Sequence, residues 1–291
     1  MIYVSTGGAP QRSAAETALD FKNHGISAVE LSGGAYHDTQ REDLVRLCRD
    51  ISFQVHNYFP PPPVPFVFNL ASTNRDVVCR SIEHARSSMY LALTLGRPVY
   101  SFHAGFRVDP IFTELGGGFE RTNLAERATA LHIFGEALLV LADEAQREGI
   151  SLLVENNVLS PENLQIFGED PLLMTEPDEI VAFMSDMPLN VGLLLDLGHL
   201  KVTAQTLDFD LVSAHTLLKP WVRGYHLSDN NATADSNQGL TEDSWFWEVI
   251  DPNLDYFSLE VHGLPAAELM LQSELASAKI AHQISCMELN S

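Results

Sequence analysis

Short apolar runs alternate with longer amphipathic stretches along most of this chain. The runs at residues 152–154 and 191–195 are almost wholly apolar, as is typical of strands buried on both faces of a parallel sheet. In the longer stretches, such as residues 78–93 and 131–145, apolar side chains recur at intervals of three and four. That spacing indicates helices with one face toward a core. We therefore expect strands and helices to alternate.

Capping signals and glycines mark the ends of the expected elements. Capping boxes at Ser13 with Glu16 and at Thr39 with Glu42 begin the first two helices, and glycines at positions 25, 96 and 149 each end a helix. Further helices are expected near residues 75–95, 123–148, 176–186, 207–218, 241–250 and 265–280. The expected strands lie at residues 1–5, 26–31, 51–55, 98–102, 152–154, 191–195, in a run ending at 226, and at 257–259.

Eight strands that alternate with helical segments predict an α/β protein, a single (β/α)8 barrel with an outer ring of helices. No linker or shift in composition divides the chain, so residues 1–291 are interpreted as one domain. The alternative is an open, doubly wound sheet. In such a sheet the ends of strands three to eight would not readily converge on one ligand.

Three segments fall outside this regular alternation. The aromatic and proline-rich run at residues 58–68 cannot be regular structure, and it forms either a substrate wall or a subunit contact. Residues 105–119 contain Gly116, Gly117 and Gly118. These glycines lack the lysine and the strand–helix setting of a phosphate loop, so we interpret them as part of a mobile lid. Residues 156–173 are expected to be irregular.

Ligand-type residues follow the last four strands. They are Glu155, Asp196, His226 and Glu260. One such residue would commonly just cap a strand, but four at consecutive strand ends indicate a site. Carboxylate oxygens and imidazole nitrogens are ligands of divalent metals. The sequence therefore predicts one main metal site formed by all four residues.

Histidines lie close to this predicted site. His56 and His103 end strands three and four, and His199 follows Asp196 by three residues. We expect these three to contact substrate, although a satisfied buried histidine is an equally simple explanation for His56 and His103. Arg107, Lys201 and Arg223 are near strand ends and could reach an anionic group.

The charge of the chain restricts its partners. The formal net charge is −22, which repels phosphodiester backbones and anionic membranes, so neither nucleic acid nor a membrane is expected as a partner. The three cysteines, at positions 48, 79 and 286, show no paired spacing and suit free thiols in a reducing cytosol. The amino terminus lacks the pattern of a signal peptide. A cytoplasmic protein is expected, and a homo-oligomer is compatible with the sequence.

On its strand-end residues and its eight-unit pattern, the chain resembles the xylose-isomerase-like barrel superfamily. That group includes sugar isomerases, ketose 3-epimerases, hydroxypyruvate isomerases, inosose dehydratases and endonuclease IV. The resemblance implies that the quartet binds one divalent ion, such as manganese, magnesium, cobalt or zinc. It also implies a carbohydrate substrate, with Glu155 and Glu260 as acid and base in a proton transfer through an enediolate.

Other branches of the superfamily fit the sequence less well. The endonuclease branch uses extra zinc-binding histidines at the places of His56 and His103, but its Asp-x-His pair is replaced here by Asp235-Ser236-Asn237. A metal-dependent phosphodiesterase is therefore the alternative, together with an inosose-type dehydratase. The catalytic lysine of xylose isomerase is not found beside Glu155. A sugar-binding barrel without turnover would leave two catalytic-type carboxylates unexplained. The sugar itself cannot be named from the sequence.

Overall fold

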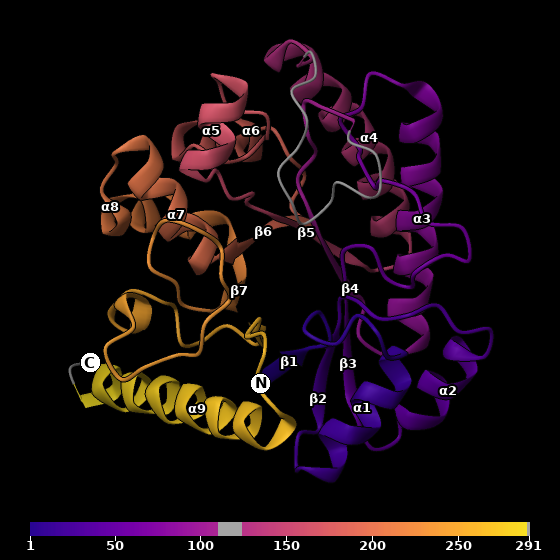
Figure 1. The fold of residues 1–291 in the computed structure, drawn as a ribbon, viewed down its shortest axis with the longest axis vertical. Helices are drawn as coiled ribbons and strands as arrows, with labels where there is room; N and C mark the ends of the chain where they lie inside the picture. Colours follow the sequence, from indigo (N-terminus) through magenta and orange to yellow (C-terminus); the bar gives the residue numbers. More distant parts are fainter. Residues whose placement is uncertain (110–123, 290–291) are drawn as a thin grey trace.

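The computed structural model describes residues 1–109 and 124–289. Within them, eight parallel strands close into one barrel in the order β1 to β8 (Figure 1), which confirms the predicted (β/α)8 class and excludes the open sheet. The run of Gly116 to Gly118, interpreted as a lid, lies outside the described residues. The strands are β1 (Ile2–Ser5), β2 (Ala28–Leu31), β3 (Ser52–His56), β4 (Val99–His103), β5 (Ser151–Glu155), β6 (Val191–Asp196), β7 (Val222–Leu227) and β8 (Phe257–Leu259).

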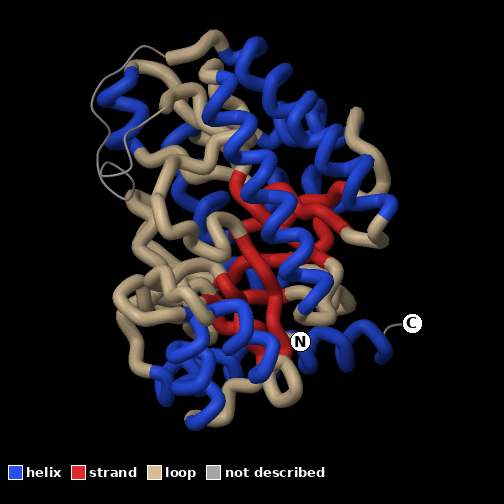
Figure 2. Tube along the Cα trace, turned by 90° about the vertical axis from the view of Figure 1, so that its right-hand side faces the viewer, coloured by secondary structure: helices blue, strands red, loops and turns tan. Residues whose placement is uncertain are grey.

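Helices surround the strands, which lie at the centre of the molecule in Figure 2. Buried side chains such as Leu44, Phe134 and Leu138 fill the space between the strands and the helices. The helices are α1 (Ala14–Asn23), α2 (Gln40–Leu47), α3 (Arg75–Thr94), α4 (Arg127–Arg147), α5 (Pro161–Phe167), α6 (Pro177–Ser185), α7 (Leu197–Leu207), α8 (Leu211–Leu218) and α9 (Ala266–Leu289), with short 3-10 turns η2 (Lys219–Trp221) and η3 (Trp245–Glu248). No helix in residues 1–109 and 124–289 is long and apolar enough to cross a membrane.

The first predicted capping box is confirmed and the second is wrong. Ser13 accepts from the backbone of Glu16, whose carboxylate accepts from the backbone of Ser13. Thr39 makes no cap at α2. Its backbone (φ −98°, ψ 9°) is outside the extended region that an N-cap adopts, and its hydroxyl donates to Asp43 Oδ2 at 2.6 Å.

Three other expected boundaries are corrected by the structure. Residues 161–167 form α5 rather than an irregular segment, capped by the side chain of Ser160 with Pro161 in its first turn. The segment expected as a helix at 241–250 holds only the turn η3. There the carbonyl of Thr241 accepts the indole N–H of Trp247 at 2.8 Å. The same carbonyl accepts the backbone N–H of Ser244 at 3.3 Å, a contact of the i to i+3 spacing found in tight turns rather than in an α-helix.

Two helices follow β6, where one was expected at 207–218. The expected helix corresponds to α8, and α7, which begins directly after β6, was missed. Asp196 is both the last residue of β6 and the N-cap of α7, and its Oδ1 accepts from the backbone N–H of His199 at 2.6 Å. Gly198 concealed this start, because glycine is a poor helix former. The structure gives it a packing reason, since a Cβ on Gly198 would lie 2.5 Å from Ser228 Oγ.

The inside of the barrel is closed below its carboxyl end by a separate cluster. Its members are Tyr3, Ala28, Leu153, Leu194 and Tyr256. Tyr256 lies directly before β8, and its hydroxyl bonds to Ser101 Oγ at 2.9 Å and Glu30 Oε2 at 2.5 Å. A Cβ on Gly224 would lie 2.7 Å from the Tyr256 ring. Glycine at this point of β7 therefore leaves the space that the tyrosine ring occupies.

Substituting Gly224 with Ala is expected to destabilise the barrel by about 1–3 kcal/mol through overpacking against Tyr256. The matched control is Gly135→Ala in α4, where the new Cβ would meet Phe183 at an ordinary 3.7 Å. That control should gain roughly 0.5–1 kcal/mol of helix stability. Urea unfolding monitored by circular dichroism measures both changes, and equal effects of the two substitutions would contradict this packing account.

Candidate metal centre at the carboxyl end of the barrel

Strand register brings the four predicted ligands into one layer. Glu155 ends β5 and Asp196 ends β6, and Asp196 pairs in register with His226 of β7. His226 pairs in turn with Ser258, two residues before Glu260. Since parallel strands deliver their carboxyl ends to one face of a barrel, these side chains converge there.

The four ligand atoms lie within 4.8 Å of one another. Nδ1 of His226 is 3.0 Å from Glu155 Oε1, 3.0 Å from Glu260 Oε2 and 3.6 Å from Asp196 Oδ2. The side chains of Glu155, Asp196 and His226 are fully buried, and that of Glu260 is 14% exposed.

Several of these buried atoms have no hydrogen-bond partner of acceptable geometry. They include both carboxylate oxygens of Glu155, Asp196 Oδ2 and His226 Nδ1. A buried polar atom left unsatisfied costs about 1–3 kcal/mol, so four in one cluster require an explanation. Oxygen and imidazole donors of this kind suit a divalent cation. The residues present therefore fit a metal.

The three histidines predicted to contact substrate all lie around this cluster. His56 Nε2 and His103 Nδ1 each approach Glu155 Oε2 at 3.3 Å, and their ligand atoms form a second group with Glu155. His199 lies in the first turn of α7. Its Nδ1 is 2.8 Å from the carbonyl oxygen of Asn156, and its Nε2 is 3.3 Å from Asp235 Oδ2.

Burial and mutual charge shift the pKa values of the two central carboxyls apart. Burial raises the pKa of Glu155 to about 7, against the lowering influence of His226. For Asp196 burial also favours the neutral form, but the charges of His199 and His226 prevail and lower its pKa to about 2.

The pKa values of the histidines in this cluster are also shifted in opposite directions. Burial opposes the charged form of His226, but the carboxylates of Glu30, Glu155 and Glu260 raise its pKa well above the usual 6.5. Burial lowers the pKa of His103 to about 3, with His199 and His226 acting in the same direction. Protonated histidine thus balances the carboxylates here, and a bound cation would supply the same positive charge.

Two buried residues of this site were missed from the sequence. Glu30 is in the middle of β2 and is fully buried, and its Oε2 lies 3.0 Å from Nε2 of His226. Glu30 could have been found from the sequence, because a carboxylate within an otherwise apolar strand is unusual. Tyr256 gave no comparable signal, because a tyrosine before a strand is ordinary.

The three basic residues noted in the sequence are engaged elsewhere. Lys201 Nζ pairs with Asp229 Oδ1 at 2.6 Å, and Arg107 pairs with Glu169 at 2.8 Å. Arg223 donates to the backbone carbonyls of Pro220 and Val222. The ion pairs and hydrogen bonds of these three side chains are thus made with groups other than the four predicted ligands.

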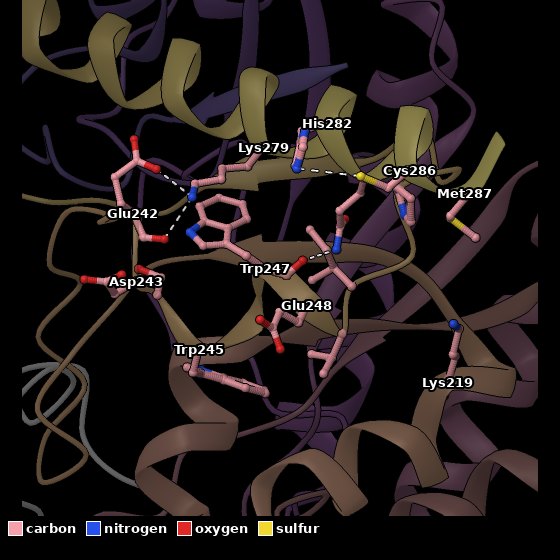
Figure 3. Close-up of a pocket in the computed structure, with 15 residues that line it drawn as sticks. Lys219, Glu242, Asp243, Trp245, Trp247, Glu248, Lys279, His282, Cys286 and Met287 are labelled. Atoms are coloured by element: carbon pink, nitrogen blue, oxygen red, sulfur yellow. Dashed lines mark hydrogen bonds and ion pairs between the residues drawn. The ribbon is translucent and has the colours of Figure 1, made fainter. Parts of the chain in front are cut away.

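A large cavity of about 860 Å³ lies away from this cluster, between η3 and α9 (Figure 3). Its lining includes Trp245 and Trp247, and Lys279 pairs there with Glu242 at 2.6 Å. It contains none of the four predicted ligands. We therefore place the chemistry at the barrel end, where buried ionisable groups converge, rather than in the cavity beside α9.

The fold and its strand-end residues define a TIM barrel with a candidate metal centre at its carboxyl face. The family described as "Xylose isomerase-like TIM barrel" matches residues 20–279. The chain belongs to this family, as the resemblance implied. The comparison with curated proteins gave no match.

Solved structures of the same fold include sugar epimerases. A D-tagatose 3-epimerase-like protein superposes with a TM-score of 0.73 at 18% identity, over 97% of this chain and 99% of the other. L-ribulose 3-epimerase gives 0.65 at 16% identity, over 99% and 94% of the two chains. A Thermus thermophilus protein, from a crystal soaked with ZnCl2, gives 0.62 at 20% identity, over 95% and 98%.

Proposed function

We propose that this protein is a divalent-metal-dependent sugar isomerase or epimerase. The observation that carries the proposal is the cluster of buried ligand atoms at the barrel end that lack hydrogen bonds. The epimerases among the similar structures support a carbohydrate substrate. Manganese, magnesium, cobalt and zinc are the candidate ions, bound at one main site.

Glu155, Asp196, His226 and Glu260 would hold the metal. When bound, the ion would supply positive charge that polarises a substrate carbonyl and stabilises an enediolate. The protein's own acid–base groups are Glu155 and Glu260. They come from β5 and β8 and approach His226 Nδ1 at 3.0 Å each, so they flank the place where the substrate would lie.

The proton chemistry then needs only these two carboxyl groups. One takes the proton from the carbon next to the carbonyl, and the other returns a proton. Return to the same carbon from the opposite side gives epimerisation. Return to the neighbouring carbon gives isomerisation, provided that the hydroxyl proton also passes from one enediolate oxygen to the other. Loss of hydroxide after the first step would give a dehydratase instead.

Exposure indicates where a sugar would enter. The side chain of His103 is 26% exposed and that of Glu260 is 14% exposed, whereas Glu155 is fully buried. We assign His103 to direct substrate contact, with His56 and His199 deeper in the same wall. Because Lys201, Arg107 and Arg223 are engaged elsewhere, an uncharged sugar is favoured over a sugar phosphate.

The test is a reconstitution series. Protein stripped with a chelator is reloaded with each of the four ions and assayed over a panel of free and phosphorylated ketoses and aldoses, with products separated by chromatography. Conversion of a free sugar only after metal addition is expected. Conversion that persists after stripping would contradict the proposed dependence on metal.

The second candidate is a metal-dependent phosphodiesterase. The observation that favours it is the additional ligand group of His56, His103 and Glu155, which would hold another ion beside the first. Against it stand the net charge of −22 and Asn237 at the place of a zinc-binding histidine. The amide nitrogen of Asn237 donates to the carbonyl oxygen of Glu260 at 3.2 Å and to Asp235 Oδ1 at 3.3 Å.

We therefore predict one main metal ion per chain and no measurable affinity for abasic duplex DNA at physiological salt. Elemental analysis of purified protein and a fluorescence binding titration measure the two quantities. An undamaged duplex of the same length is the control. Three zinc ions per chain, or cleavage at the abasic site, would favour the hydrolase.

A further inference from the structure

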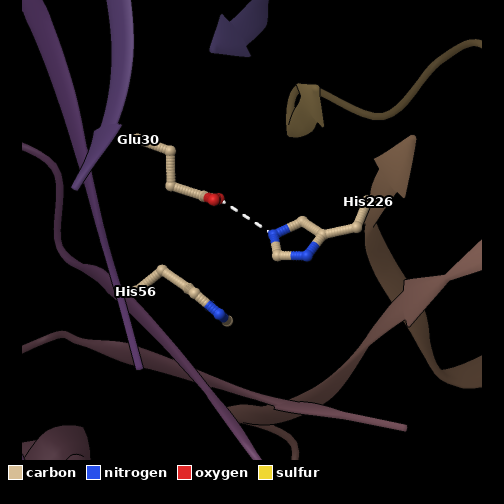
Figure 4. A group of neighbouring side chains, drawn as sticks. All are labelled: Glu30, His56 and His226. Carbon is tan, nitrogen blue, oxygen red and sulfur yellow. Dashed lines mark hydrogen bonds and ion pairs between the residues drawn. The ribbon is translucent and has the colours of Figure 1, made fainter. Parts of the chain in front are cut away.

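A chain of buried hydrogen bonds runs beneath the candidate metal centre and connects two of its histidines. His56 Nδ1 is 3.0 Å from Ser101 Oγ, which is 2.9 Å from the hydroxyl of Tyr256. That hydroxyl donates to Glu30 Oε2 at 2.5 Å, and the same oxygen lies 3.0 Å from His226 Nε2. Figure 4 shows Glu30 pointing to one side of His226, with His56 beside them.

The carboxylate of Glu30 fixes the direction of every bond in this chain. An ionised carboxylate only accepts, so Tyr256 and His226 Nε2 both donate to it. Burial and the nearby Glu30 raise the pKa of Tyr256 well above 10, which keeps its proton in place. Since Tyr256 has a single proton, its oxygen must accept from Ser101. Ser101 has then used its own proton and must accept from Nδ1–H of His56.

Both histidines consequently present a defined nitrogen to the cluster. His226 keeps its proton on Nε2 in either charge state, and once a bound cation takes the place of its second proton, the lone pair of Nδ1 faces Glu155 and Glu260. With its proton on Nδ1, neutral His56 directs the lone pair of Nε2 toward Glu155 Oε2, 3.3 Å away. A lone pair facing a carboxylate is unfavourable unless a cation lies between them.

We propose that Glu30 is a positioning residue that sets the tautomer of His226 directly and that of His56 through Tyr256 and Ser101, so that Nδ1 of His226 is free for the metal and Nε2 of His56 is free to accept at the substrate wall. The proposal rests on the metal-dependent function above. Outer partners of this kind orient metal-binding histidines and fix their tautomers. The backbone supports the arrangement, because Gly224 leaves the space that Tyr256 needs.

A direct ligand role for Glu30 is the competing explanation. Glu30, His56 and His226 do offer ligand atoms within 4.8 Å of one another. Oε2 of Glu30 accepts the Tyr256 proton at 2.5 Å, whereas its Oε1 is buried without a hydrogen-bond partner. The two explanations differ in metal stoichiometry, which the experiment below measures.

The experiment compares Glu30→Gln, Tyr256→Phe and Ser101→Ala with wild type. Metal affinity is measured by competition with a chromophoric chelator for zinc, and tautomers by ¹H–¹⁵N spectra of protein labelled at histidine. Glu30→Gln is expected to weaken zinc binding by about 10- to 100-fold without changing the number of ions bound. Tyr256→Phe frees the Ser101 proton to turn toward His56, so the proton of His56 should move from Nδ1 to Nε2.

Ser101→Ala and a second tyrosine variant separate this role from general destabilisation. Ser101→Ala should release the tautomer of His56 while zinc affinity stays within about threefold of wild type, because the bond from Glu30 to His226 is intact. Tyr225→Phe is the matched control, since this buried tyrosine bonds to His215 Nε2 at 3.0 Å outside the site. Tyr225→Phe should change neither the zinc affinity nor the tautomer of His56.

Zinc affinity within twofold of wild type in Glu30→Gln, or an unchanged His56 tautomer in Tyr256→Phe, would overturn the proposal. Loss of a whole metal equivalent in Glu30→Gln would make Glu30 a ligand and would overturn it as well. A wild-type protein that binds no metal would instead refute the proposed function. The tautomer of His56 in metal-free protein would still test the hydrogen-bond chain.

Discussion

Replacing Asp196 with Asn is expected to weaken metal binding on the order of a hundredfold or more, while the barrel remains folded. Loss of a partner outside the ligand sphere already costs about 10- to 100-fold, and Asp196 Oδ2 is one of the proposed ligand atoms. Asn keeps an oxygen that can accept from the backbone of His199, so the cap of α7 survives. The metal-free variant should be somewhat less stable than metal-free wild type at neutral pH, because His199 and His226 lower the pKa of Asp196 to about 2 and the fold therefore favours its charged form.

Asp210→Asn provides the matched control. Asp210 is the N-cap of α8, where its side chain accepts from the backbone of Ser213 at 2.8 Å, so both substitutions change the same type of cap. Equilibrium dialysis followed by elemental analysis measures the metal content, and thermal unfolding with and without metal measures the stability. Full metal occupancy in Asp196→Asn would remove this residue from the ligand set.

The second large effect is expected on turnover. Glu155→Gln and Glu260→Gln keep the shape of the side chain but remove the proton acceptor, and each should lower kcat by on the order of a hundredfold or more. Both carboxylates are also proposed ligands. Rates are therefore compared at metal concentrations that saturate each variant, so that weak binding is not mistaken for lost catalysis.

The two glutamine variants need not behave alike. If proton removal depends on one carboxylate only, the variant that lacks the returning acid should still exchange substrate protons without net conversion. Near-normal turnover in both metal-saturated variants would limit the carboxylates to metal binding. His199 and His103 would then be the next candidates for acid–base chemistry.

The fold could be predicted because its signals are local. Two-sided burial gives apolar strands, and intervals of three and four give helices, whatever the distant parts of the chain do. Local signals failed where the folded chain sets a backbone conformation that the pattern does not contain. Thr39 precedes Glu42 by three residues but lies outside the extended region of an N-cap, and the segment after Thr241 forms only the turn η3.

The site could be predicted from the sequence only in part, because local patterns do not specify contacts between distant residues. In a parallel barrel, strand ends share one face, so Glu155, Asp196, His226 and Glu260 could be grouped without coordinates. The hydrogen bond between Tyr256 and Glu30 joins residues 226 positions apart. Which two side chains meet inside the barrel depends on strand order and register, and no short pattern in the sequence contains that information.

Deuterium incorporation tests the central claim of metal-dependent proton transfer most directly. Metal-free protein is mixed with a ketose converted in the reconstitution series, in deuterated water, and the carbon next to the carbonyl is followed by NMR before and after metal is added. We predict no exchange before the addition and steady incorporation of deuterium afterwards, which excess chelator stops. Sugar conversion that continues with chelator present, or conversion with metal that leaves this carbon free of deuterium, would contradict the account.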